Sequence, residues 1–335
     1  MSNELFKVAL VGCGVISKNH LKALTENENV QIVALCDNKP GRTARRVSEY
    51  AIANCKEYLD YEEMLDTEVL DAVHICTPHY LHAAMTIAAL KRNINVFLEK
   101  PTAINEKELE DMMEAERNSS ARVCICFQNR YNPSTILVKK LVEEDGGATS
   151  AFGSLFWERS TEYYTESDWR GRYATEGGGV MINQAIHTID LLCEFLGKPI
   201  AVTATTANHK HKGIIEVEDT CEGLIEFEGG KQGNFFATTA STGSEYTMIR
   251  IRTPKRVISL MPPHVYVNNV QVDDPSLVDD YVGKECYGNG HKYLIKKFYK
   301  ALKNGTEIPV PLPRSQYALR ILLGAYKSND QRVEI

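Results

Sequence analysis

Three side chains in this sequence have the chemistry needed to hold or move a proton at a reacting oxygen. Lys100 follows the apolar run INVFLE and precedes Pro101, which places it at the end of a predicted strand. Asn183 and His187 are four residues apart in a segment with helical spacing, so we expect them on one helix face. Histidine accepts protons near neutral pH, and a fixed lysine stabilises a developing alkoxide. The plainer alternatives are a solvated surface lysine and a buried structural histidine.

A glycine-rich turn near the N-terminus has the pattern of a dinucleotide site. Gly12 and Gly14 come directly after the apolar run FKVALV and before a segment with helical spacing, although Ser17 holds the third motif position. In that context the glycines allow a tight turn and close approach of a pyrophosphate to the helix N-terminus. Asp37 ends the next apolar run. A carboxylate at that position accepts hydrogen bonds from the ribose hydroxyls of NAD and repels the 2′-phosphate of NADP. We therefore expect NAD to be favoured over NADP; alternatively, Asp37 caps the following helix.

The elements that carry these residues alternate between strand and helix in the first half of the chain. Short apolar runs predict strands, and periodic segments between them predict helices at 18–27, 41–54, 81–93 and 105–118. This alternation is typical of a Rossmann-type, doubly wound parallel sheet. Ligands of such sheets bind at the carboxyl ends of the strands, where we expect Gly12, Asp37, Thr77 and Lys100 to meet.

The pattern changes after residue 127. We expect a strand at 151–160, a helix at 178–197, long strands with a hairpin at Gly229-Gly230, and helices near 291–303 and 315–327. The predicted fold is therefore α/β, with a Rossmann dinucleotide-binding domain at 1–127. An α+β domain with a largely antiparallel open sheet follows at 128–335, for substrate binding and oligomerisation.

Composition excludes several classes of protein. The net charge of −6 gives no basic surface for nucleic acid or anionic lipid, and no apolar run reaches the length of a membrane span. The chain start lacks the features of a signal peptide. Most of the nine cysteines lie in apolar runs without the spacing of a zinc site, so we expect no metal and a cytoplasmic location.

Several motifs together resemble the Gfo/Idh/MocA family, named for glucose–fructose oxidoreductase, inositol dehydrogenase and a rhizopine catabolism protein. The resemblance covers essentially the whole chain. It is carried by Glu99-Lys100-Pro101, by the run from Gly177 to Asp190, by Thr77-Pro78 with His82, by Gln128–Pro133, and by Asp168-Trp169-Arg170-Gly171.

The resemblance implies that Lys100 is catalytic, together with His187. Many family members carry aspartate where this chain has Asn183, and an amide cannot relay a proton. That departure leaves a Lys100 and His187 pair, with Asn183 orienting the substrate. The Asn183-Gln184 variant is similar to branches acting on nucleotide-linked sugar acids. Asp190, three residues after His187, is expected to anchor its helix.

The remaining expected contacts follow from position and from the resemblance. For the substrate they are Asn183, Arg170, Trp169, Arg130 and His291. Arg130 and Arg170 suit a carboxylate or phosphate, although either could form an internal salt bridge. His79, His209 and His211 are expected at the surface. For the cofactor the expected contacts are Gly12, Gly14, Val15, Ile16, Asp37, Thr77, Pro78, His82, Glu99, Lys100, Asn129, Trp169 and Arg170.

Two functions from different classes fit this pattern. The first is an NAD-dependent oxidoreductase that moves a hydride between nicotinamide and a hydroxyl carbon of a sugar, polyol or nucleotide sugar. The second is a catalytically silent nicotinamide-binding sensor with the same fold, which Asn183 favours and the intact Lys100 and His187 disfavour. In either case we expect a small sugar-like ligand, and a homodimer or homotetramer formed through the C-terminal sheet.

Overall fold

The computed structural model describes residues 5–277 and 288–335. The chain divides into two compact units, Met1–Cys126 with His291–Ser315 and Phe127–Gly290 with Gln316–Ile335. The first unit therefore includes a late segment that the sequence placed in the second domain. It is held there by backbone pairing, because Ile125 N–H donates to the Val310 carbonyl over 3.0 Å.

The first unit is built on a six-stranded parallel sheet in the order β3-β2-β1-β4-β5-β6. The central strands are buried on both faces, which explains their continuous apolar runs. The strands are β1 (Phe6–Val11), β2 (Val30–Cys36), β3 (Lys56–Tyr58), β4 (Ala72–Ile75), β5 (Asn95–Leu98) and β6 (Val123–Ile125). The predicted doubly wound sheet is thereby confirmed.

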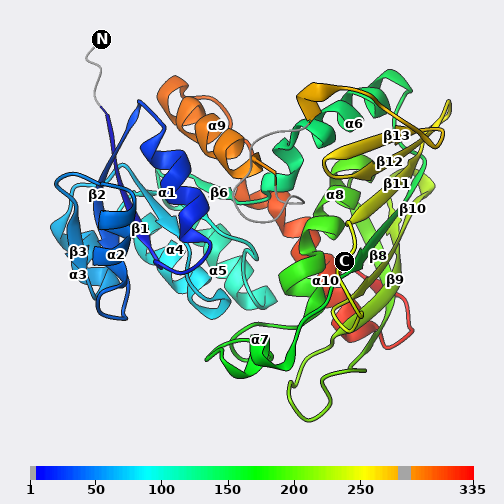
Figure 1. The fold of residues 1–335 in the computed structure, drawn as a ribbon, viewed down its shortest axis with the longest axis horizontal. Helices are drawn as coiled ribbons and strands as arrows, with labels where there is room; N and C mark the ends of the chain where they lie inside the picture. Colours follow the sequence, from blue (N-terminus) through cyan, green and yellow to red (C-terminus); the bar gives the residue numbers. More distant parts are fainter. Residues whose placement is uncertain (1–4, 278–287) are drawn as a thin grey trace. The chain divides into compact units, whose positions relative to one another are not determined.

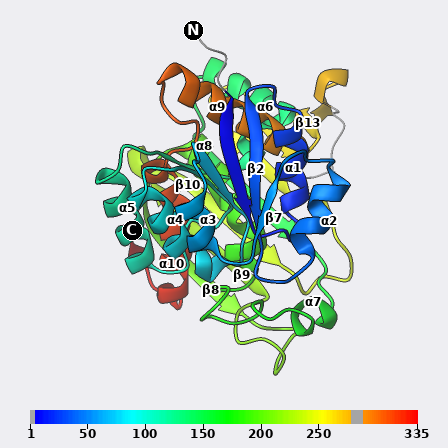
Figure 2. The ribbon, with the colours of Figure 1, turned by 90° about the vertical axis from the view of Figure 1, so that its left-hand side faces the viewer.

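Helices cover both faces of this sheet. Figure 2 shows α1 and α2 on one side of it and α4 and α5 on the other. The helices of this part of the chain are α1 (Ser17–Thr25), α2 (Arg42–Glu49), α3 (Tyr61–Thr67), the 3₁₀ turn η1 (His79–Leu81), α4 (His82–Lys91), α5 (Glu106–Arg117) and α9 (Gly290–Asn304). The predicted helix at 41–54 is too long, because Ala51 and Asn54 have positive φ angles of 48° and 56°.

The second unit contains a nine-stranded sheet in the order β14-β13-β12-β11-β7-β10-β9-β8-β15 (Figure 1). Neighbouring strands run antiparallel except β7 and β10, which are parallel. The strands are β7 (Ser150–Phe156), β8 (Pro199–Ala207), β9 (Thr220–Phe227), β10 (Lys231–Thr238), β11 (Met248–Arg252), β12 (Val257–Met261), β13 (His264–Val267), β14 (Val270–Gln271) and β15 (Val333–Glu334). The expected largely antiparallel sheet and the Gly229-Gly230 hairpin are confirmed.

One helix supports the candidate site and packs on this sheet. The predicted helix at 178–197 begins as a π-turn, η3 (Met181–Ala185), and continues as α8 (Ile186–Leu196). Gly153 of β7 permits close packing, because a Cβ there would lie 2.4 Å from the Thr188 methyl group. The other helical segments are η2 (Gln128–Tyr131), α6 (Pro133–Glu144), α7 (Thr161–Thr165), η4 (Glu228–Gly230), η5 (Pro275–Leu277) and α10 (Leu312–Ser328), in which the boundary between the units falls.

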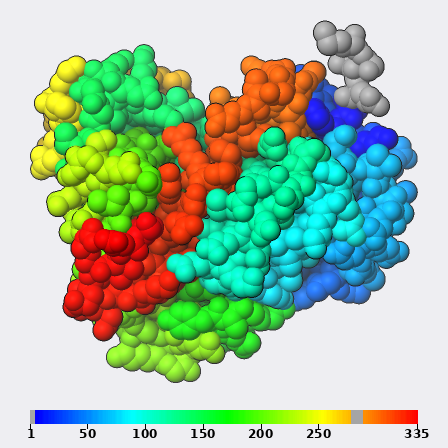
Figure 3. Space-filling view, turned by 180° about the vertical axis from the view of Figure 1, so that it is seen from behind, coloured from blue at the N-terminus to red at the C-terminus, as the bar shows by residue number. Residues whose placement is uncertain are grey.

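The chain ends at the surface of the second unit. In Figure 3 its last residues are the red atoms at the surface, and β15 pairs antiparallel with β8. Within the described residues, no helix combines the length and apolar character needed to cross a membrane.

Candidate active site

The glycine-rich turn of the first unit joins β1 to α1. Gly12 has a φ of +90°, and a Cβ there would lie 2.5 Å from the Cys76 carbonyl oxygen, so this position requires glycine. A Cβ on Gly14 would meet no atom within 4 Å, and this leaves the backbone open to a ligand. Val15, the next residue, has 85% of its surface exposed. These features fit a dinucleotide pyrophosphate at the start of α1.

Asp37 lies at the end of β2 beside this turn. Its carboxylate accepts hydrogen bonds from the backbone N–H of Cys13 over 2.8 Å and of Lys39 over 2.9 Å. The Arg42 guanidinium lies 3.5 Å from the same carboxylate. The structure therefore places Asp37 at the end of β2, as the sequence predicted, and shows that its carboxylate holds the glycine-rich turn in place.

A buried arginine that sequence reasoning missed also fixes this turn. Arg46 of α2 donates to the Gly14 carbonyl over 2.6 Å and to the Ser17 hydroxyl over 3.2 Å. Its side chain is 3% exposed. The charged helix around it offers no signal that singles out Arg46, because its partners lie some thirty residues earlier in the chain.

Glu99 is the centre of a buried polar network at the end of β5. It accepts hydrogen bonds from His20 Nε2 over 2.9 Å and from His291 Nε2 over 3.3 Å. Its other oxygen accepts the Lys100 N–H over 3.2 Å. Burial alone would raise the pKa of Glu99, but the contacts with the two histidines outweigh burial and hold that pKa well below its ordinary value.

The ionised Glu99 carboxylate determines which ring nitrogens of His20 and His74 carry a proton. Because Glu99 can only accept, His20 donates through Nε2 and must accept at Nδ1, which lies 2.9 Å from His74 Nδ1. His74 therefore donates through Nδ1 and accepts from the Tyr299 hydroxyl at Nε2 over 2.8 Å. Burial lowers the pKa of both His20 and His74, in agreement with two neutral rings.

This network also has the composition of a metal site. Potential ligand atoms of His20, Glu99, Cys126 and His291 lie within 4.8 Å of one another, and all four residues are buried. His20 and His291 each donate a hydrogen bond from Nε2 to Glu99, so the ring nitrogens that face this cluster carry protons.

Lys100, half-buried, lies at the carboxyl edge of the same sheet as the glycine-rich turn. The neighbouring loops are joined by His82, whose ring nitrogens lie 2.7 Å from the Pro101 carbonyl and 3.0 Å from the Thr77 carbonyl. His82 is fully buried, so its ring holds these two loops together and does not face solvent. His291, expected at the substrate, is placed in the Glu99 network.

In the second unit, three glycines lead into the π-turn. A Cβ on Gly179 would lie 1.8 Å from the Glu218 carbonyl oxygen, and one on Gly178 would lie 1.9 Å from the Tyr326 hydroxyl. The Glu218 carboxylate accepts from the N–H groups of Gly179 and Met181 over 2.9 and 3.0 Å, and from the Tyr326 hydroxyl over 3.0 Å. Burial raises the pKa of Glu218 to about 7.

Asn183 lies inside the π-turn with its amide engaged by two neighbours. Its Nδ2 donates to the Glu176 carboxylate and, over 3.3 Å, to the Tyr163 hydroxyl. Gln184 Nε2 donates to the same hydroxyl over 3.2 Å. Glu176 is 1% exposed, and its second oxygen accepts the Gly171 N–H. An amide rather than a carboxylate at residue 183 is therefore the complement of a buried glutamate.

His187 lies in the first turn of α8 and is 8% exposed. Its Nε2 lies 3.4 Å from Gln128 Nε2, and its ring meets the Phe127 ring edge-on with centroids 6.2 Å apart. The same stretch of chain carries Asn129, whose buried Oδ1 has no hydrogen-bond partner among the described residues.

The two candidate anion-binding arginines differ sharply in their contacts. Arg130 donates to both oxygens of Asp190, over 2.8 and 2.5 Å, and to Glu194 over 2.7 Å, and it is 8% exposed. Arg130 and Asp190 thus form an internal ion pair that joins η2 to α8. Arg170 instead stacks on aromatic rings, with its guanidinium carbon 4.3 Å from the Tyr163 centroid and 4.9 Å from the Trp169 centroid.

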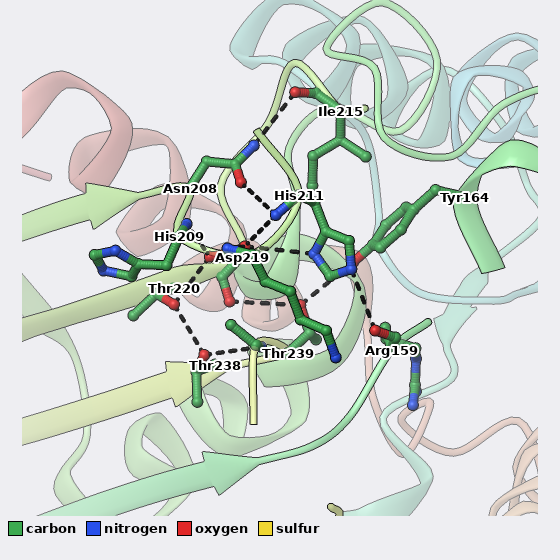
Figure 4. Close-up of polar contacts among 12 residues, drawn as sticks. Arg159, Tyr164, Asn208, His209, His211, Ile215, Asp219, Thr220, Thr238 and Thr239 are labelled. Carbon is green, nitrogen blue, oxygen red and sulfur yellow. Dashed lines mark hydrogen bonds and ion pairs between the residues drawn. The ribbon is translucent and has the colours of Figure 1, made fainter. Parts of the chain in front are cut away.

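Two histidines expected at the surface are buried. His79 is 4% exposed and His211 is fully buried, whereas His209 is exposed as expected. Figure 4 shows His211 held between neighbouring segments: its Nε2 lies 3.2 Å from the Arg159 carbonyl, and its ring packs edge-on against Tyr164. The expectation failed because these partners lie about fifty residues earlier in the chain.

Two family profiles match most of this chain. The profile described as "Oxidoreductase family, NAD-binding Rossmann fold" (GFO_IDH_MocA) matches residues 6–127, and that of the GFO/IDH/MocA C-terminal domain matches residues 137–258. Inositol 2-dehydrogenase of Salmonella paratyphi B is 33% identical over 139 residues, which are 41% of each chain. That match spans about two-fifths of the relative's length.

Longer matches cover nearly the whole chain. Inositol 2-dehydrogenase of Rhizobium meliloti is 24% identical over 90% of both chains. The WlbA dehydrogenase of Bordetella pertussis, solved with NADH and UDP-GlcNAcA, is 26% identical and covers 99% of both chains with a TM-score of 0.85.

Proposed function

This chain belongs to the GFO/IDH/MocA oxidoreductase family, and on that premise we propose that it transfers a hydride between NAD(H) and a hydroxyl-bearing carbon of a sugar, polyol or nucleotide sugar. The observation that carries the proposal is the common sheet edge of Gly12, Asp37 and Lys100, which lie at the carboxyl ends of β1, β2 and β5. A dinucleotide bound at such an edge is within reach of residues that follow the neighbouring strands.

The residues of the first unit would hold the cofactor and steady the reacting oxygen. The backbone at Gly14 would bind the pyrophosphate, and the Asp37 carboxylate would accept hydrogen bonds from the ribose hydroxyls. Bound NAD supplies the hydride acceptor. Lys100 stabilises the negative charge that develops on the substrate oxygen as its proton leaves. Glu99 fixes the Lys100 backbone through its hydrogen bond to the Lys100 N–H.

The residues of the second unit would orient the substrate and take the proton. His187 is the proposed base, because an imidazole accepts a proton near neutral pH. Asn183 is the proposed orienting residue, since its amide is held by Glu176 and Tyr163. UDP-GlcNAcA, the ligand named for the Bordetella pertussis dehydrogenase, and inositol are the first substrates to test.

The decisive experiment follows reduced nicotinamide by absorbance during incubation with NAD and a panel of sugars. We expect turnover with at least one sugar, and a kcat about 10²–10³-fold lower in Lys100→Ala with a smaller effect on NAD binding. His187→Ala should remove the acidic limb of the pH profile of kcat/KM. Binding of NAD without turnover of any sugar would favour the sensor function instead.

We also propose that the second sheet mediates a homodimer or homotetramer. Phe152, Phe156 and Phe236 lie on the face opposite α8, and the last two stack with centroids 5.1 Å apart. Phe152 is 37% exposed on that face. Native mass spectrometry of the protein and of Phe152→Asp would test the assembly.

The cysteines of the described residues are free thiols, which supports a reducing, cytoplasmic location.

A further inference from the structure

We propose that Ser17 and Arg46 are positioning residues for the cofactor, which together turn the peptide between Gly14 and Val15 so that its N–H faces the pyrophosphate of NAD. The inference rests on the proposed function, because it concerns the cofactor of that reaction. Ser17 holds the third position of the glycine-rich motif, where glycine or alanine is usual. The departure at this position is therefore functional and does not weaken the motif.

Two donors meet at the Gly14 carbonyl oxygen. The Ser17 hydroxyl donates to this oxygen over 2.7 Å, and Nη2 of Arg46 donates to it over 2.6 Å. The Ser17 oxygen in turn accepts from Arg46 Nε over 3.2 Å, so the three groups form a closed set of hydrogen bonds. Ser17 is 0% exposed and Arg46 is 3% exposed, which places both side chains behind the turn.

The third nitrogen of the Arg46 guanidinium is engaged as well. Nη1 donates to the Glu49 carboxylate, and Glu49 lies 3.3 Å from the Lys18 ammonium group. These contacts join α2 to α1, which lie on the same side of the sheet (Figure 2). Because all three of its nitrogens donate within the protein, Arg46 acts on the cofactor through the peptide that it holds and does not bind the cofactor directly.

The direction of the Gly14 carbonyl determines the direction of the next N–H group. In a planar trans peptide, the C=O and N–H groups point in opposite directions. Since Arg46 and Ser17 draw the Gly14 oxygen toward α2, the Val15 N–H points away from α2. This orientation makes the N–H available to an anion at the start of α1.

The protein itself uses the N–H groups that come earlier in the turn. The Gly12 N–H donates to the Cys36 carbonyl over 2.9 Å, and the Cys13 N–H donates to the Asp37 carboxylate over 2.8 Å. Among the described residues, the next three N–H groups have no protein acceptor, and they belong to Gly14, Val15 and Ile16. The pyrophosphate donors of this turn therefore begin at the peptide that Ser17 and Arg46 hold.

A glycine at residue 14 makes this control necessary. The absence of a side chain leaves the turn open to the cofactor, but it also gives the backbone more conformations than any other residue would. Ser17 and Arg46 restrict that freedom before the cofactor arrives. A donor that is already ordered binds more tightly, because less conformational entropy is lost on binding.

Restoring the usual motif residue gives the sharpest test. Ser17→Ala retains a side chain that the motif allows but removes the hydroxyl group from the Gly14 carbonyl. We expect NADH binding to weaken about two- to tenfold, which is the effect of one lost hydrogen bond, in a titration followed by nicotinamide fluorescence. If Ser17→Ala binds NADH as tightly as the native protein, or more tightly, the proposal is wrong.

Substitution of Arg46 should have a larger effect. Arg46→Gln loses a charged donor, and we expect NADH binding to weaken at least about tenfold. Arg46→Lys keeps the charge without the planar fork and should give an intermediate Kd, which provides a second measurement if the glutamine variant folds poorly. Arg45→Gln is the matched control, because Arg45 is the preceding residue of α2, is exposed and carries the same charge. An equal loss of binding in Arg45→Gln would assign the effect to net charge and overturn the proposal.

Nucleotide fragments distinguish positioning of the peptide from a general structural role. ADP contains the diphosphate and adenosine lacks it, and both can be measured by displacement of NADH. Ser17→Ala and Arg46→Gln should weaken the binding of ADP and leave that of adenosine unchanged. Equal weakening of both ligands would show that the substitutions disturb the whole site, which contradicts the proposal.

The same variants separate this inference from the proposed function, since NADH binding requires no turnover. In the NAD-reduction assay, Ser17→Ala should raise the KM for NAD and leave kcat at saturating NAD nearly unchanged. Weaker NADH binding in the variants without turnover of any sugar by the native protein would contradict the proposed function alone. Turnover by the native protein, with unchanged NADH affinity in Ser17→Ala and Arg46→Gln, would overturn this inference alone.

Discussion

Replacing Asn183 by aspartate should destabilise the protein in a pH-dependent way. The Asn183 amide donates to the Glu176 carboxylate, which is 1% exposed. Aspartate at residue 183 brings two carboxylates to hydrogen-bond distance in place of a donor and an acceptor. Two like charges about 4 Å apart repel by about 4 kcal/mol at an effective dielectric constant of about 20, and the lost hydrogen bond adds about 1.5–3 kcal/mol.

Protonation limits this cost. Because the two carboxylates cannot both ionise easily, the pKa of one of them rises in the folded variant above its value in the unfolded chain. A raised folded-state pKa gives stability that is present at low pH and is lost as the pH rises through it. Protonating one carboxyl costs about 1.4 kcal/mol for each pH unit above its ordinary pKa of about 3.9, so we expect a destabilisation of about 5–6 kcal/mol at pH 8 and about 2 kcal/mol at pH 5.5.

Urea unfolding at the two pH values measures this difference. Asn183→Ala is the matched control, because it removes the donor to Glu176 without adding a charge and should therefore show a clearly smaller difference between the two pH values. A variant Asn183→Asp that is as stable as the native protein at pH 8, or equally destabilised at both pH values, would refute the contact with Glu176 as the reason for asparagine.

Four other substitutions test separate parts of the structure. Asp37→Ala should reduce the preference for NAD over NADP, measured as the ratio of the two dissociation constants, and an unchanged ratio would contradict the role of its carboxylate. Glu218→Gln should flatten the pH dependence of unfolding free energy. The native group has a pKa near 7 when folded against an ordinary value of 4.5, so its contribution to stability falls as the pH rises from about 4.5 to about 7, by up to about 1.4 kcal/mol per pH unit. Gly179→Ala should lower stability by about 1–3 kcal/mol or more in thermal unfolding, since its Cβ meets the Glu218 carbonyl. Gly14→Ala, whose Cβ meets nothing, should unfold like the native protein but bind NAD more weakly.

The sequence was most informative where a local pattern determines position. Lys100 and Asp37 follow short apolar runs that are typical of buried strands, so their place at one sheet edge could be predicted before the structure. The overextended helix at 41–54 shows the limit of this approach, because the left-handed conformation of Ala51 leaves no mark in the apolar pattern.

Contacts between distant residues could not be predicted in this way. Arg130 and Arg170 look alike in sequence as anion ligands, and only the partner of Arg130, sixty residues away, separates them. Glu218 gives no sequence signal, since its carboxylate accepts a hydrogen bond from the N–H of Gly179, about forty residues earlier in the chain. His211 looks like a surface residue because its lysine neighbours are exposed.

The π-turn at Met181–Ala185 has a consequence for how this segment can change. Its hydrogen bonds skip one residue more than those of an α-helix, so the turn contains one residue in excess. Gly179 contacts Glu218, and α8 packs on β7 and β10. Since an α-helix rotates by about 100° per residue, the extra residue determines how far α8 is rotated about its axis relative to Gly179. Deleting any one residue of the turn would force one of these two dockings out of register. The segment can therefore vary in residue type more easily than in length.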